Sequence, residues 1–181
     1  MSIPKIQLAK LKSTFAQLER QGVQYGLGAK AEGYTISGVH WNPNSNGHLT
    51  TPVNTLQHID CSGFVRYILF QATDGALVIP DGSQAQREWF EAAADRGDTH
   101  KLAQYSDANT YISESRLFIG FIKPNTNGCG PVGHVWLIGQ FDEDVSAETM
   151  ESYGGHGVGS RNWNAIPLRT EVYSVYALPT A

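Results

Sequence analysis

An eight-residue stretch, DCSGFVRY at residues 60–67, constrains more than any other how this chain can fold. The apolar residues after Cys61 recur at helical spacing, and Asp60 is of a type that favours the N-cap, so a helix is predicted to begin at the cysteine. The positive end of a helix stabilises a thiolate, and its N–H groups can hold the oxyanion of an acyl-transfer intermediate. Cys61 is therefore a candidate nucleophile, although a lone cysteine is more commonly a small buried residue.

The bulk composition excludes several classes of protein. The chain has 181 residues, of which 41% are hydrophobic and 17% charged, as expected for one globular domain. The net charge of −4 and the lack of a clustered basic stretch argue against nucleic-acid binding. No run approaches the roughly 18 apolar residues of a membrane span, and residues 1–5 lack the apolar core of a signal peptide. We therefore expect a protein made in the cytoplasm without a classical signal peptide.

The residue pattern predicts helices in the first half of the chain and strands in the second. Amphipathic spacing indicates a helix over residues 4–21 with Pro4 in its first turn, and a capping-box pattern from Ser83 indicates another over residues 84–95. Strands are predicted over residues 117–122, 134–139, 148–153 and 171–178. The expected fold is α+β, with one domain over residues 1–181 that has a helical part at about 1–96 and a mostly antiparallel sheet at about 115–181.

A cysteine nucleophile needs a base, and the base needs a partner that orients it. His134 is the best candidate base because it opens a predicted strand directly after Gly133, where a side chain can point into a cleft. Taken alone, a histidine at a strand start is more often a satisfied polar group. Glu151 on the next predicted strand is the first candidate for the orienting partner, and His156 in the glycine-rich turn that follows is the second.

The other histidines and the two cysteines indicate no metal site. His40, His48 and His58 lie in an irregular polar segment, and their spacings of eight and ten residues match no metal-binding signature, so we expect them in surface loops. Cys61 and Cys129 form no paired zinc-binding motif. A single disulfide between them is compatible with the sequence.

Together, these motifs resemble those of the NlpC-type cysteine peptidases, papain-like enzymes that cut the stem peptides of peptidoglycan. The segment DCSGFV at residues 60–65 resembles their nucleophile motif, and GHV at residues 133–135, followed by WLI, resembles their base motif. An aromatic–glycine motif before the cysteine and a polar residue on the strand after the histidine complete the same order over about residues 23–155. The resemblance implies a papain-like fold in which the nucleophile helix packs on a mostly antiparallel sheet.

By this resemblance, Cys61 attacks the scissile carbonyl as a thiolate, and His134 first sustains the thiolate and then protonates the leaving amine. The third residue is most often histidine in the family, and the matching position here holds Glu151. No metal or organic cofactor is implied. The residues implied to contact the oxyanion or the substrate are Tyr25, Asp60 and Ser62.

A bare domain of this kind resembles the amidase effectors that bacteria deliver through type VI secretion, and it also resembles phage lytic enzymes. The resemblance implies peptidoglycan stem peptides as substrate, with cleavage expected between D-glutamate and the diamino acid. It further implies a monomer that acts in the periplasm or cell wall after specialised delivery. An effector would have an immunity protein as partner, and neither nucleic acid nor membrane is expected as one.

Two other functions stay open at this stage. In the first, Cys61 and Cys129 form a disulfide that silences the nucleophile, and the chain is a non-catalytic cell-wall binding or interaction module. In the second, the chain is a papain-like acyltransferase, since one fold serves several chemistries.

Overall fold

The computed structural model describes residues 2–28, 49–102, 117–125, 133–139, 148–161 and 174–181. Within these ranges the helices are α1 (Leu8–Arg20), α2 (Cys61–Ala72) and α3 (Ser83–Asp95), with a short 3-10 turn, η2 (Val53–Thr55). The strands are β1 (Gln24–Tyr25), β2 (His58–Ile59), β3 (His100–Lys101), β4 (Leu117–Ile122), β5 (His134–Gly139), β6 (Glu148–Tyr153), β7 (Gly157–Gly159) and β8 (Ser174–Ala177). Among the described residues, no helix combines the length and apolar character needed to cross a bilayer.

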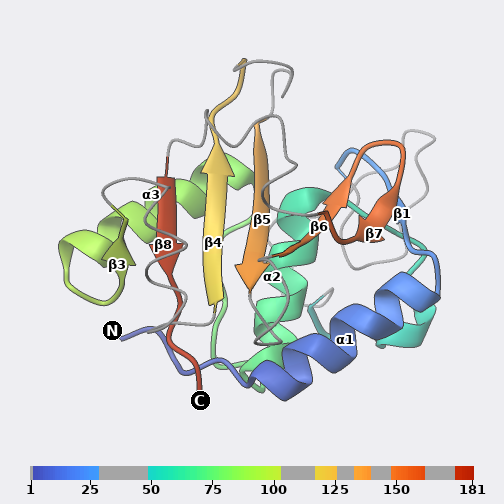
Figure 1. Cartoon of the computed structure of the whole chain (residues 1–181), viewed down its shortest axis with the longest axis horizontal. Helices are drawn as coiled ribbons and strands as arrows, with labels where there is room; N and C mark the ends of the chain where they lie inside the picture. Colours follow the sequence, from blue (N-terminus) through green and yellow to red (C-terminus); the bar gives the residue numbers. More distant parts are fainter. Residues whose placement is uncertain (1, 29–48, 103–116, 126–132, 140–147, 162–173) are drawn as a thin grey trace.

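Six of the strands form one sheet in the order β3-β8-β4-β5-β6-β7, and each neighbouring pair is antiparallel. A separate parallel pair joins β1 to β2. Figure 1 shows α2 and α3 behind the central strands and α1 crossing below them beside α2. The predicted α+β fold with a mostly antiparallel sheet is therefore confirmed, as are the strands predicted over residues 117–122, 134–139 and 148–153.

Helix α2 lies at the centre of the core. Ten of its twelve residues are buried, which is the pattern of a helix with neighbours on every side. Its apolar side chains pack against α1 and against strands β5 and β6. Since close-packed interiors leave little freedom for rigid-body movement, this burial fixes the first residue of α2, Cys61, relative to the sheet.

The first helix begins later than predicted. Helix α1 starts at Leu8, and Pro4 lies before it in a segment without regular secondary structure. The main chain of Ile6 is already paired with the C-terminal segment, because its N–H donates to Pro179 O (2.8 Å) and its carbonyl accepts from Ala181 N (3.0 Å). These contacts are non-local, so the helical periodicity from residue 4 gave the wrong start.

The capping box predicted from Ser83 is also wrong. Ser83 is the first helical residue of α3, and Gly82, with a φ of 84°, occupies the N-cap without a side-chain hydrogen bond. Gln86 does not turn back to the helix start. It is fully buried, and its amide donates to the carbonyls of Ser62 (2.9 Å) and Pro80 (3.0 Å). The residue therefore ties α3 to the first turn of α2.

The order of elements is less simple than helices followed by strands. The two-residue strands β1, β2 and β3 lie in the first 101 residues, and segments this short carry too little pattern to be recognised. His58, expected in a surface loop, is a half-buried residue of β2. The last predicted strand is seen as β8 over residues 174–177, and its first residues, 171–173, lie outside the described residues, as do His40, His48 and Cys129.

Candidate active site

Cys61 is the first residue of α2, as the sequence predicts. The N-cap is Asp60, whose Oδ1 accepts hydrogen bonds from the Gly63 N–H (2.6 Å) and the Ser62 hydroxyl (3.1 Å). The N-terminal turn is therefore held by side-chain capping, which also directs the Ser62 hydroxyl toward Asp60. Cys61 is a free thiol and is only 6% exposed. A free Cys61 argues against the disulfide-linked binding module.

His134 opens strand β5 opposite Ile122 of β4. The residue before it, Gly133, has a φ of 68°, and a Cβ at that position would lie 2.5 Å from the Ile122 carbonyl oxygen. Only glycine permits both the left-handed backbone and this close approach. The glycine turn therefore fixes the point at which the chain enters β5, and it places the imidazole, which is 14% exposed, within hydrogen-bonding reach of Cys61.

Glu151 holds the far side of the imidazole. Its Oε2 lies 2.7 Å from His134 Nε2, which leaves Nδ1 for the Cys61 thiol. The carboxylate is fully buried in β6. The neighbouring Ser152 donates to the carbonyl of Ile59 (2.7 Å), two residues before the cysteine, so the strand that carries Glu151 is tied to the start of α2. The structure thus brings together the three residues that the sequence favoured as nucleophile, base and orienting partner.

Arg161 also contacts the candidate site, although no motif in the sequence predicted it. Its Nε donates to Glu151 Oε1 (2.8 Å) and its Nη2 donates to Oε2 (2.6 Å). The Thr149 hydroxyl adds a third donor, to Oε1 (2.6 Å). A β-hairpin predicted around the glycine-rich turn, with Glu151 paired to Gly159 as in the structure, would have placed Arg161 opposite Thr149 and diagonal to Glu151. This register is the sequence signal from which Arg161 could have been found.

The pKa values of the histidine and the carboxylate move apart. Burial alone would lower the pKa of His134, but its hydrogen bonds to Cys61 and Glu151, and the charges of both, raise it to about 9. Burial alone would raise the pKa of Glu151, but the hydrogen bonds and charges of His134 and Arg161 lower it to about 2. At neutral pH the site therefore holds an imidazolium beside an ionised glutamate.

Tyr25 lies beside the nucleophile, as the family resemblance implies. Strand β1 pairs with β2 so that Tyr25 is opposite Ile59, just before the cap of α2. Burial, together with the charges of Cys61 and Asp60, raises the pKa of Tyr25 to about 12. Its hydroxyl therefore stays protonated at neutral pH and can donate a hydrogen bond to a developing oxyanion.

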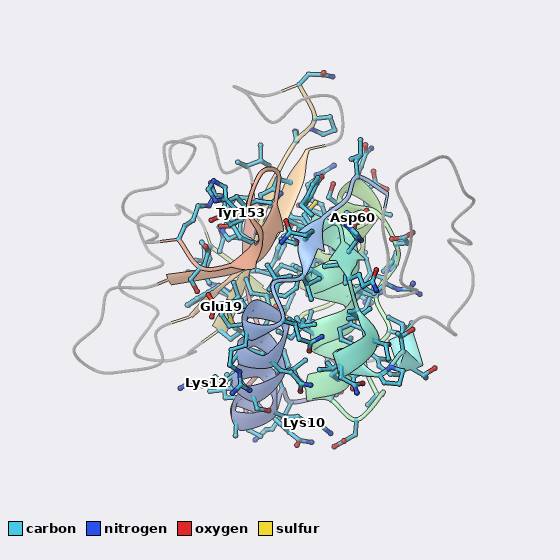
Figure 2. All side chains as sticks on the ribbon, turned by 90° about the vertical axis from the view of Figure 1, so that its right-hand side faces the viewer. Lys10, Lys12, Glu19, Asp60 and Tyr153 are labelled. Atoms are coloured by element: carbon cyan, nitrogen blue, oxygen red, sulfur yellow. The ribbon has the colours of Figure 1, made fainter. Side chains whose placement is uncertain are left out.

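His156, the second candidate for the orienting partner, lies apart from His134. It occupies the exposed turn between β6 and β7, and its ring contacts the Tyr153 ring at 4.8 Å between centroids. The Tyr153 ring also contacts the Arg161 guanidinium, which lies 4.3 Å from the ring centroid. Figure 2 shows Tyr153 and Asp60 toward one end of the molecule, and Lys10 and Lys12 toward the other. The site therefore lies where the β6–β7 hairpin meets the start of α2.

A tryptophan supports the imidazole from its own strand. The rings of His134 and Trp136 stack with centroids 5.4 Å apart at an angle of 25°. Trp136 lies over Gly120 of the adjacent strand β4, where an added Cβ would come within 2.9 Å of the indole Cε2. The glycine therefore leaves the space in which the indole, and through it the imidazole, is positioned.

Gly120→Ala is expected to destabilise the protein by about 1–3 kcal/mol and to lower any activity of the site, because overpacking displaces the Trp136 indole. Gly154→Ala is the matched control, since a Cβ there meets nothing within 4 Å. Urea denaturation of both variants checks the expectation. Equal free energies of unfolding for the two would contradict this account of the indole.

The free energy of unfolding is expected to fall as the pH rises from about 6.5 to about 9. His134 binds its proton more tightly in the folded protein, so its contribution is complete below the ordinary pKa of 6.5 and is lost as the pH passes about 9. The pKa rises by about 2.5 units, and at about 1.4 kcal/mol per unit the loss amounts to about 3–4 kcal/mol. The Glu151 carboxylate makes stability depend on pH in the acidic range. Its contribution to the free energy of unfolding is present above pH 4.5 and is lost as the pH falls toward about 2.

Denaturant titrations at several pH values measure this dependence. Cys61→Ala should flatten the alkaline fall, because that change removes the thiol that raises the pKa of His134. A wild-type stability that stays level from pH 6.5 to 9.5 would contradict the paired imidazolium.

The arrangement contains what nucleophilic amide chemistry requires. A thiol at a helix N-terminus faces one nitrogen of an imidazole, whose other nitrogen is held by a buried carboxylate. Within the described ranges, no group of three or more histidine, cysteine, aspartate and glutamate side chains is placed to hold a metal ion. The arrangement can therefore support attack by sulfur on a carbonyl carbon, with a tyrosine hydroxyl nearby.

No protein-family model matches the chain, and no curated protein matches it. Among solved structures, the chain is similar to a crystal structure from Staphylococcus aureus subsp. aureus Mu50, described as similar to a lipoprotein of the NLP/P60 family, with a TM-score of 0.44 and 14% sequence identity. That similarity covers 100% of this chain and 45% of the other, so this chain spans under half the length of that protein.

Proposed function

We propose that this protein is an NlpC-type, papain-like cysteine peptidase that hydrolyses amide bonds in the stem peptides of peptidoglycan. The observation that carries the proposal is the contact between the free Cys61 thiol and His134, with Glu151 2.7 Å from the far nitrogen of the imidazole. The nucleophile and base motifs around Cys61 and His134 supply the substrate class, because both resemble those of peptidases that cut peptidoglycan.

In the first half of the proposed reaction, the Cys61 thiolate attacks the scissile carbonyl carbon and a C–S bond forms. The Cys61 backbone N–H and the Tyr25 hydroxyl donate to the oxyanion. His134 then gives the proton on Nδ1 to the amide nitrogen, the C–N bond breaks, and the amine leaves. Glu151 accepts a hydrogen bond from the Nε2–H of His134 throughout, which keeps the ring oriented and stabilises its charged form.

In the second half, neutral His134 takes a proton from water while the water oxygen attacks the thioester carbonyl. The C–S bond breaks, a carboxylic acid leaves, and the thiolate–imidazolium pair is restored. The proposed bond is that between D-glutamate and the diamino acid, and the proposed place of action is the cell wall. The Glu151 carboxylate remains ionised in every step, because the permanently charged Arg161 guanidinium donates to both of its oxygens.

Digestion of purified muropeptides tests the proposal. Disaccharide tripeptides and tetrapeptides are incubated with the protein and separated by liquid chromatography with mass spectrometry. We expect pairs of fragments whose masses add up to the substrate plus one water, with one fragment ending at D-glutamate. Transfer of the acyl fragment to an added amine in place of water would indicate an acyltransferase. Intact muropeptides after incubation with folded wild-type protein would refute the proposal.

A further inference from the structure

The guanidinium of Arg161 has the geometry of a built-in support for the glutamate. It reaches both oxygens of Glu151 through two different nitrogens, at 2.8 Å and 2.6 Å. Two parallel hydrogen bonds of this kind fix the plane and the distance of a carboxylate, which a lysine cannot do. With 32% of its side chain exposed, Arg161 lies at the edge of the site while the carboxylate is fully buried.

The main chain of Arg161 is anchored as firmly as its side chain. Its carbonyl accepts from the Thr149 N–H (2.8 Å), and its N–H donates to the Thr149 hydroxyl (2.9 Å). The same hydroxyl donates to Glu151 Oε1 (2.6 Å). The residue therefore approaches Glu151 from a fixed point at the end of the β6–β7 hairpin, and its position does not depend on the long side chain alone.

The hydrogen bonds around Glu151 favour the ionised carboxylate, because its partners are hydrogen-bond donors. Oε1 accepts from Arg161 and Thr149, and Oε2 accepts from Arg161 and lies 2.7 Å from His134 Nε2. The charged groups that face Glu151 from the described elements are His134 on β5 and Arg161 after β7, and Cys61 on α2 lies beyond the imidazole. A buried carboxylate with these donors loses two charge-assisted hydrogen bonds if the arginine is removed.

We propose that Arg161 is a positioning residue of the hydrolytic site, which acts through Glu151 by fixing both carboxylate oxygens and keeping the group ionised. This inference rests on the proposed function for its consequence in catalysis. By this proposal, Arg161 keeps the Glu151 carboxylate ionised, so that Oε2 remains a hydrogen-bond acceptor for His134 Nε2–H. Without the arginine, the carboxylate keeps only its contacts with Thr149 and His134 and takes up a proton at a higher pH. The imidazole then loses its orienting partner.

A merely structural arginine would behave differently. Such an arginine would stabilise the β6–β7 hairpin through its contact with the Tyr153 ring and its main-chain hydrogen bonds to Thr149, without any effect on Glu151. Loss of these contacts would lower stability and activity at every pH and would leave the pKa of Glu151 unchanged. The two roles therefore separate in a pH titration and in a double-mutant cycle.

The first test needs no substrate. In the wild type, the NMR signals of the His134 ring are expected to sense no protonation of Glu151 above about pH 3. In Arg161→Gln, an acidic inflection should appear at a higher pH, and Arg161→Lys should stay closer to the wild type because it keeps the charge. Arg96→Gln is the control, since Arg96 pairs with Asp98 at an exposed site. An unmoved inflection in Arg161→Gln would overturn the proposal whether or not the protein cuts peptidoglycan.

The second test uses hydrolysis of muropeptides. Arg161→Gln should lower kcat by roughly 10- to 100-fold with a smaller change in KM, and it should move the acidic limb of the pH profile upward. In a Glu151→Gln background, the same change should lower kcat by less than about 3-fold, because its target is gone. An equal fall in both backgrounds would overturn the proposal. Should Arg161→Gln fail to fold, Arg161→Lys is used in the same cycle, with a reduced kcat expected only where Glu151 is present.

Discussion

Cys61→Ala is expected to lower hydrolysis of muropeptides by at least about 10⁴-fold, to the background rate. The variant retains the helix start, the imidazole and the glutamate but lacks the sulfur that forms the thioester, and the loss of a nucleophile removes most of the rate enhancement in comparable enzymes. The free energy of unfolding should fall by about 1–3 kcal/mol at neutral pH, because the variant loses the thiol that raises the pKa of His134. The rate of fragment release by mass spectrometry is the measurement.

Cys129→Ser is the matched control for this loss. It removes the other cysteine of the chain and should leave hydrolysis at the wild-type rate. Hydrolysis by Cys61→Ala at a rate near that of the wild type would exclude sulfur as the nucleophile. Thermal unfolding of each variant separates a chemical loss from a loss of fold.

Glu151→Gln is expected to lower kcat by about 10²- to 10⁴-fold, since the amide no longer stabilises the imidazolium or enforces its tautomer. The pKa of His134 should fall in this variant, because the hydrogen bond and charge of Glu151 are among the causes that raise it. The protein should also lose about 1–3 kcal/mol of stability, because the donors of Arg161 and Thr149 lose a charged acceptor. NMR titration of the imidazole and initial rates measure the two effects.

Glu91→Gln provides a control with similar chemistry outside the site. Its carboxylate accepts hydrogen bonds from Lys101 and Tyr176, and it lies on α3 at a half-exposed position. Removal of this charge should leave kcat unchanged and cost less than about 1 kcal/mol. If Glu91→Gln and Glu151→Gln lowered kcat equally, the role assigned to Glu151 would be wrong.

The elements that the sequence predicted well are those specified by neighbouring residues. Asp60 and the apolar spacing after Cys61 place the start of α2, and the buried runs of β4 and β5 are recognisable from composition alone. The contact between His134 and Glu151 follows from two adjacent antiparallel strands, together with the family resemblance. Local signals were sufficient because each of these features lies within a single element or between consecutive strands.

The features that the sequence did not predict depend on distant contacts. Helix α1 starts late because Ile6 pairs with the C-terminal segment. The Gln86 amide does not cap α3 but donates to the carbonyls of Ser62 in α2 and Pro80 before α3. Arg161 reaches Glu151 only through the register of the β6–β7 hairpin. The stack of Trp136 on His134 depends on the absence of a side chain at Gly120 of the adjacent strand. Composition and periodicity contain no direct measure of these distances.

The pairing of β1 with β2 shows the same limit at the site itself. These two strands are separated by more than thirty residues and have two residues each, yet they bring Tyr25 beside the nucleophile. The family resemblance implied this position for the tyrosine, whereas the pattern of the chain did not. Only the parallel register, with Tyr25 opposite Ile59, gives a physical reason for it.

The most direct test of sulfur as the attacking atom is the mass of the protein itself during turnover. Wild-type protein is mixed with a muropeptide, quenched in acid within the first turnovers, and analysed intact and after digestion at low pH. We expect a mass increase equal to the acyl fragment, mapped to the peptide that begins the second helix and absent when Cys61 is alanine. An acyl adduct on any other residue, formed at the rate of product release, would contradict the assignment.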